Sequence, residues 1–94
     1  MRVFVLIITY NAEKWIEFCL GSLKDSTIPI TPLIVDNNSN DKTVSLIKEK
    51  YPEAIILANN QNLGFGKANN IGIKYAIEKG FDYVFLLNQG TVFI

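Results

Sequence analysis

Four short apolar runs, each followed by a polar segment, constrain the fold of this chain more than any other feature. The runs are nearly continuous rather than alternating, which is typical of strands that are covered on both faces in a parallel sheet. They cover Val3 to Ile8, Pro32 to Val35, Ala54 to Ala58 and Tyr83 to Leu87. We therefore expect the chain to build its core around one sheet.

The three segments between these runs have the apolar spacing of helices. The first, from about Ala12 to Lys24, repeats apolar residues at i, i+3, i+4 and i+7, with Asn11 as its expected N-cap. The second starts near Asp41, and the third begins after Gly66 and finishes at Gly80. Consecutive βαβ units with right-handed crossovers predict an α/β fold, a three-layer open parallel sheet of four strands with helices on both faces.

The composition is that of one globular domain, which we expect to span residues 1–94. With 49% apolar and 19% charged residues, the chain lies near the globular average and far from the disordered class. Nine basic residues balance nine acidic ones, so no overall charge attracts nucleic acid or an anionic membrane. The apolar start is too short for a signal peptide or a membrane span, and we expect a cytoplasmic protein.

The residue types present exclude some kinds of catalysis. The chain has no histidine, so it cannot build a Ser-His or Cys-His nucleophile pair by itself. Its single cysteine, Cys19, lies in a helical pattern and is expected to be a small buried hydrophobe rather than a reactive thiol.

Polar residues concentrate directly after the four apolar runs. They form the segments Thr9–Asn11, Asp36–Asp41, Asn59–Gly66 and Asn88–Gly90, and all ten asparagines lie in these segments or in the first turn of the third helix. In a parallel sheet all four segments emerge at the carboxyl edge, where open α/β sheets bind ligands. A single asparagine is commonly a turn residue, but the whole set at one edge favours a polar ligand site.

Two carboxylates at this edge have different expected roles. Asp36 directly follows the second run and is well placed to contact a ribose or a base edge, while its alternative role is to cap the turn before the second helix. Asp41 lies where that helix starts, so an N-cap role is favoured over a ligand role.

The glycine-rich segment from Asn62 to Gly72 follows the third run. Its glycines are spaced Gly-x-Gly-x-x-Asn, so it is not a dinucleotide fingerprint. Glycines at a strand-to-helix junction permit close backbone approach and leave N–H groups free at a helix N-terminus, which favours phosphate. Lys67 would supply the only positive charge on that rim, or it is simply a solvated lysine.

Four motifs in order resemble those of the family 2 glycosyltransferases with the GT-A fold. They read Thr-Tyr-Asn, Val-Asp-Asn-Asn-Ser-Asn-Asp, Asn-Leu-Gly-Phe-Gly-x-Ala-Asn-Asn-x-Gly and Phe-Leu-Leu-Asn, and they cover essentially all 94 residues. The group that looks most similar is rhamnosyltransferase-like and builds surface polysaccharide. The resemblance implies the Rossmann-like, N-terminal nucleotide-binding portion of a transferase. Such an enzyme moves a sugar from a UDP- or dTDP-type donor to a glycan or lipid-linked acceptor.

The resemblance also implies a set of nucleotide-binding residues. In the family, the residues that match Thr9, Tyr10 and Asn11 line the nucleoside pocket, and the aspartate that matches Asp36 contacts the base or ribose. The full expected set is Thr9, Tyr10, Asn11, Asp36, Asn38, Asn62, Gly64, Gly66, Asn69 and Asn88.

The family's metal motif matches Asn88-Gln89-Gly90. The family usually has an aspartate at the third of these positions, which helps to hold Mg²⁺ or Mn²⁺ against the diphosphate. Gly90 offers only its backbone carbonyl, so we expect no metal ligand there and no strong metal binding.

The carboxylate that acts as general base in inverting family members has no counterpart either. We therefore expect a domain truncated at the metal-motif strand, with no catalytic residue and no activity alone. The alternative is a non-catalytic nucleotide-binding or self-associating module. Tyr83–Leu87 and Val92–Ile94 would leave an apolar edge, which predicts self-association through the C-terminal strand.

Overall fold

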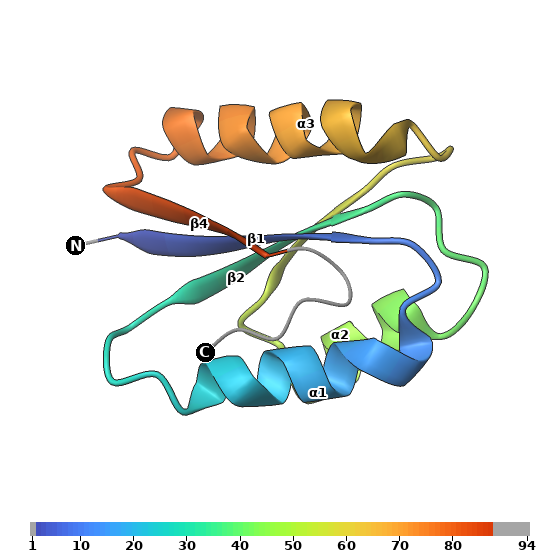
Figure 1. The fold of residues 1–94 in the computed structure, drawn as a ribbon, viewed down its shortest axis with the longest axis horizontal. Coiled ribbons are helices and arrows are strands. Elements are labelled where there is room, and N and C mark those ends of the chain that lie inside the picture. The colour runs from blue at the N-terminus through green and yellow to red at the C-terminus, as the bar shows by residue number, and fades with distance from the viewer. Residues whose placement is uncertain (1, 88–94) are drawn as a thin grey trace.

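The computed structural model describes residues 2–87 and has one parallel sheet between two layers of helices (Figure 1). Strands and helices alternate along the chain as β1 (Val3–Thr9), α1 (Glu13–Lys24), β2 (Thr31–Asp36), α2 (Thr43–Lys50), β3 (Ile55–Ala58), α3 (Gly64–Glu78) and β4 (Tyr83–Leu87). Helices α1 and α2 cover one face of the sheet, and α3 covers the other. The predicted fold class is confirmed.

The order of the strands reverses beside β1. All neighbours are parallel, in the order β3-β2-β1-β4. The chain steps outward from β1 to β3, and α3 then carries it back across the sheet to pair β4 with the free side of β1. Open α/β sheets bind ligands at the carboxyl ends of the strands where the order reverses in this way. In Figure 1 this edge lies on the right, where β1 and β2 end and α3 begins.

The core explains why the first apolar run does not alternate. All seven residues of β1 are buried, and successive side chains enter opposite layers. Val5 and Ile7 pack in the cluster that contains α1, whereas Phe4, Leu6 and Ile8 pack in the cluster that contains α3. Helix α3 approaches closely at Gly72, where an added Cβ would lie 2.3 Å from a Leu6 methyl carbon.

Two helix starts differ from the prediction. Asn11 is not the N-cap of α1, because it has a left-handed φ of 50° and Ala12 occupies the cap position. Helix α3 begins at Gly64 rather than after Gly66, because the Asn62 side-chain oxygen accepts the Gly64 N–H at 2.9 Å and starts the turn earlier. The predicted end of α3 is confirmed, since Gly80 follows it with a φ of 71°.

Cys19 is buried in the core, and burial raises the pKa of its thiol to about 11, in agreement with an unreactive small hydrophobe. Between residues 2 and 87, the structure contains no helix with the length and apolar character needed to cross a membrane. The cytoplasmic location stays a prediction. The metal motif and Val92–Ile94 lie outside the described residues.

Candidate functional site

A cavity of about 410 Å³ opens at the carboxyl edge of β1 and β2, on the side of the sheet that α3 covers. Its lining residues come from the ends of both strands and the start of α3, and they are Ile8, Thr9, Tyr10, Asn37, Asn62, Gly64 and Phe65. This volume falls in the range of roughly 300–1,000 Å³ that is usual for small-molecule sites. A smaller hollow of about 290 Å³, walled by Leu20 and Pro29 among others, lies away from this edge at the amino end of β2.

The Asp36 carboxylate ties the end of β1 to the turn after β2. It is only 2% exposed. One oxygen accepts hydrogen bonds from the Thr9 and Ser39 hydroxyls, both at 2.6 Å, and the other accepts the Ser39 N–H at 2.9 Å. The turn-capping role that the sequence left open is therefore present. A contact between Asp36 and a ligand stays a prediction.

Asn11 fastens the loop after β1 to the same turn. Its N–H donates to the Ser39 hydroxyl at 2.9 Å, and its side-chain oxygen accepts the Asn40 N–H at 2.7 Å. The Asn11 side-chain oxygen is thus bonded to the backbone of the neighbouring turn. The end of β1 and the turn after β2 consequently form one connected unit beside the cavity.

Asp41 caps two helices at once. Its carboxylate accepts the Thr43 N–H in the first turn of α2 at 3.0 Å and the Glu13 N–H in the first turn of α1 at 3.1 Å. Burial raises the pKa of Asp41, but hydrogen bonds from the Thr43 side chain and backbone and from the Glu13 backbone outweigh it and lower the pKa. The expected N-cap position is wrong, because Lys42 occupies it, but the Asp41 side chain does accept a first-turn N–H of α2.

The cavity walls combine two aromatic side chains with one oriented amide. Tyr10 is 41% exposed and Phe65 is 52% exposed, so both can offer ring surface to a ligand. The Gly64 N–H can only donate, so it fixes the oxygen of the Asn62 amide toward the backbone. The Asn62 amide nitrogen must then face the other way.

Four of the predicted site residues line this cavity: Thr9, Tyr10, Asn62 and Gly64. Asp36 supports it through Thr9, and Gly66 and Asn69 lie in the first two turns of α3 without lining it. Asn11 and the exposed Asn38 belong to the neighbouring loops, and Asn88 lies outside the described residues.

Sequence reasoning missed three lining residues, Ile8, Asn37 and Phe65. A signal existed for Phe65, because a large aromatic residue between two glycines in a polar segment has little core to enter. Ile8 follows from strand alternation, since it lies on the same face of β1 as Phe4 and Leu6.

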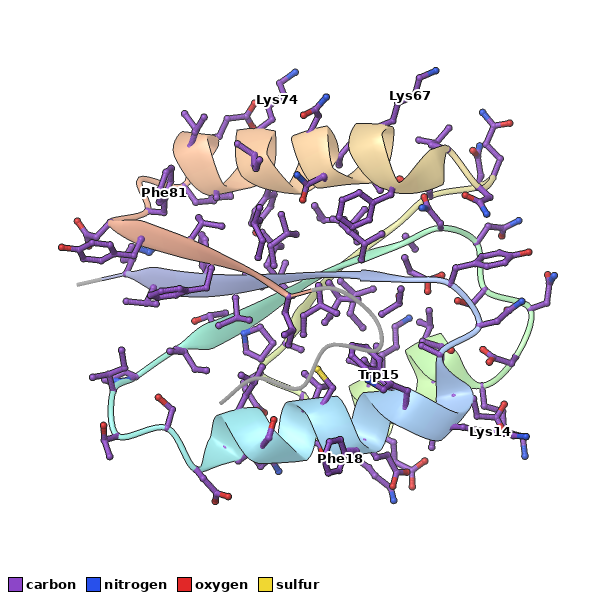
Figure 2. The ribbon with its side chains drawn as sticks, in the orientation of Figure 1. Lys14, Trp15, Phe18, Lys67, Lys74 and Phe81 are labelled. Carbon is purple, nitrogen blue, oxygen red and sulfur yellow. The ribbon has the colours of Figure 1, made fainter. Side chains whose placement is uncertain are left out.

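Lys67 does not point toward the cavity. Figure 2 shows that Lys67 and Lys74 project from the outer side of α3, away from the sheet. The solvated alternative for Lys67 therefore describes it correctly. Within the described chain, the lining of this cavity includes no lysine or arginine.

The described residues do not fit a divalent metal ion. Residues 2–87 contain no group of three or more His, Cys, Asp or Glu side chains that could hold one. Asp36, which accepts a hydrogen bond from the cavity-lining Thr9, already has hydrogen bonds on both oxygens. The expected Mg²⁺ or Mn²⁺ motif at Asn88–Gly90 lies beyond this part of the chain, so no chemical step is assigned to a metal here.

Comparison with known proteins identifies relatives of this chain. The family model described as glycosyl transferase family 2 matches residues 4–89. The chain is 36% identical over 96 residues to the minor teichoic acid biosynthesis protein GgaB of Bacillus subtilis (strain 168), covering 93% of this chain and 11% of that protein. It is 30% identical over 95 residues to the dTDP-rhamnosyl transferase RfbF of Shigella flexneri, covering 96% of this chain and 30% of that protein.

Comparison with solved structures also finds proteins with a similar fold. The crystal structure of S. aureus TarS 1-349 superimposes with a TM-score of 0.85 at 26% identity, covering 98% of this chain and 28% of that one. The same protein in complex with UDP gives a TM-score of 0.83 at 25% identity. The chain thus spans less than a third of the length of each of these relatives.

Proposed function

The chain belongs to glycosyl transferase family 2, and we propose that the cavity beside β1 binds the nucleotide of a UDP- or dTDP-type sugar donor. The observation that carries this proposal is the placement of the cavity at the strand ends, with aromatic surface and the start of α3 around it. The domain would form the donor-binding half of an enzyme that transfers the sugar to a glycan or lipid-linked acceptor. The names of RfbF, a dTDP-rhamnosyl transferase, and of TarS in complex with UDP support a pyrimidine nucleotide.

The base is held mainly by stacking. Tyr10 and Phe65 come from different elements and present partly exposed rings to one cavity. Stacking of a base on an aromatic side chain contributes about 1–3 kcal/mol in single-stranded nucleic-acid complexes, and it needs no particular hydrogen-bond pattern. The oriented Asn62 nitrogen adds N–H donors, which suit a pyrimidine carbonyl oxygen.

The diphosphate lies toward the start of α3. The first N–H groups of a helix have no partner within it, and the helix dipole favours negative charge there. Gly66 opens onto free space, because an added Cβ would meet nothing within 4 Å. Phosphate can therefore approach the backbone of this first turn without steric obstruction.

Calorimetric titration with UDP, dTDP, ADP and GDP, with and without Mn²⁺, tests the proposal. We expect the two pyrimidine nucleotides to bind more tightly than the two purine nucleotides. Tyr10→Ala and Phe65→Ala should each weaken binding by at least about fivefold, which corresponds to the lower end of the stacking range. Failure of the unmodified chain to bind either pyrimidine nucleotide would contradict the proposed function.

Phe18→Ala is the matched control for these aromatic variants. Phe18 is 62% exposed and projects from the outer side of α1, on the opposite face of the sheet from α3 (Figure 2). Its removal should leave nucleotide affinity unchanged. If Phe18→Ala weakened binding as much as Phe65→Ala, the assay would be reporting a general property of the fold rather than this cavity.

A self-associating module remains the second candidate, and the exposure of β4 favours it. Within the described sheet β4 is an edge strand that pairs with β1, and Tyr83 and Leu86 are 56% and 53% exposed. Edge strands with apolar side chains pair readily with other chains. Multi-angle light scattering should then detect dimers at high concentration, and a strictly monomeric species would refute this candidate.

A further inference from the structure

Asn37 connects three elements that meet at the cavity. Its backbone N–H donates to the Thr9 carbonyl at 2.8 Å, at the end of β1. Its side-chain oxygen accepts the Asn59 amide at 2.9 Å and the Leu63 N–H at 3.4 Å. Its side-chain nitrogen donates to the Gly64 carbonyl at 3.2 Å, in the first residue of α3. Only 3% of Asn37 is exposed.

These bonds set the separation of the two cavity walls. One wall is the end of β1 with Tyr10, and the other is the segment from Asn62 to Phe65. That segment leaves β3 and enters α3, so no strand pairing or helical bond fixes it to β1. The Asn37 side-chain amide supplies that link through both its oxygen and its nitrogen.

The Asn37 oxygen is not available to a ligand. An amide oxygen has two lone pairs, and both are used by Asn59 and Leu63. We infer that Asn37 is a positioning residue of the nucleotide site, which holds the start of α3 at the right distance from β1 for a base to enter between Tyr10 and Phe65. This inference rests on the proposed function and adds a residue to it.

A variant at Asn59 distinguishes a positioning role of Asn37 from direct contact between Asn37 and the ligand. Asn59 bonds to Asn37 but does not line the cavity. If Asn37 acts through position, Asn59→Ala should weaken UDP and dTDP binding about threefold and Asn37→Ala about tenfold, and the double variant should be no weaker than Asn37→Ala alone. Asn60→Ala is the matched control, because Asn60 is an exposed asparagine in the same loop and should leave affinity unchanged.

Amide hydrogen exchange in the nucleotide-free protein gives a second readout. The Leu63 N–H donates to Asn37, so Asn37→Ala should speed exchange at Leu63 while the amides of β1 keep their protection. Thermal unfolding identifies any variant that has lost its fold, and affinities are compared only among folded variants.

The outcomes are distinct. Weaker binding in Asn37→Ala together with unchanged binding in Asn59→Ala would overturn the inference in favour of direct ligand contact. Unchanged binding in Asn37→Ala would overturn it outright. If the unmodified chain bound no nucleotide, the proposed function would fail, and exchange at Leu63 alone would decide whether Asn37 positions the start of α3.

Discussion

Replacing Asp36 with alanine should destabilise the domain strongly, because the carboxylate organises the buried end of β1. Asp36 accepts three hydrogen bonds, and one of the donors, the Thr9 hydroxyl, is 0% exposed and would lose its acceptor. Hydrogen bonds to a charged group contribute about 1.5–3 kcal/mol each, and an unsatisfied buried donor costs about 1–3 kcal/mol. Ser39 is partly exposed, so water can replace its partner.

Since these terms overlap, we expect Asp36→Ala to lower the free energy of unfolding by about 3 kcal/mol. A domain of this size has a total stability of about 5–14 kcal/mol, so the variant should still fold. Its melting temperature should fall by about 12–24 °C. Urea unfolding followed by the fluorescence of Trp15, the single tryptophan, gives the free energy directly.

Two comparisons show whether the loss arises from this network. Asp25→Ala removes an exposed carboxylate and should change stability by less than about 0.5 kcal/mol. Thr9→Val should cost about 1 kcal/mol in the original chain and much less in the Asp36→Ala background, where its acceptor is already gone. A loss below about 1 kcal/mol for Asp36→Ala, or an equal cost of Thr9→Val in both backgrounds, would refute the reasoning.

Three further variants test other parts of the fold by the same urea assay. Asp41→Ala should lower the free energy of unfolding by about 1–2 kcal/mol at neutral pH, because it removes a cap from two helices. This difference from the original chain should shrink as pH falls through the lowered pKa of Asp41. A difference that did not change with pH would contradict this explanation. Burial raises the pKa of the Cys19 thiol from its ordinary value of 9.0 to about 11 in the folded state, so stability should decline as pH rises from 9 to 11, and Cys19→Ala should remove that part of the decline. Gly72→Ala should cost about 1–2 kcal/mol, because the clash with Leu6 at 2.3 Å outweighs the better helix propensity of alanine. Gly21→Ala, whose added Cβ meets its nearest atom at 3.7 Å, should be neutral or stabilising, and equal effects at the two glycines would exclude the packing explanation.

The layered fold was predictable because its signal is local. A strand that is buried on both faces needs an apolar side chain at nearly every position, and β1 and β2 satisfy this over consecutive residues. The position of the candidate site followed as well, since parallel strands bring their polar ends to one edge, where the cavity lies. Neither conclusion required knowledge of which side chains touch.

The partners within the site were not predictable, because they are distant in sequence. Thr9 and Asp36 are separated by 27 positions, as are Asn37 and Gly64, and no spacing rule connects them. The mistaken N-cap at Asn11 has the same origin. Asparagine suits a cap by composition, but here its backbone is left-handed and its side chain binds a turn 29 residues away.

The many asparagines at this edge are explained first by the hydrogen bonds that the loop backbones require. Loop backbones lack the regular partners of helices and strands, and buried N–H and carbonyl groups must still be satisfied. Asn11, Asn37 and Asn62 each accept a backbone N–H of these loops through the side-chain oxygen, which directs that oxygen toward the loop backbone. The groups left for a ligand are then the rings of Tyr10 and Phe65, the Asn62 nitrogen and the N–H groups that follow Gly64 in the first turn of α3. Affinity at this edge should consequently depend more on the two aromatic side chains than on any carboxylate, whereas loss of an asparagine should act mainly through the shape of the site.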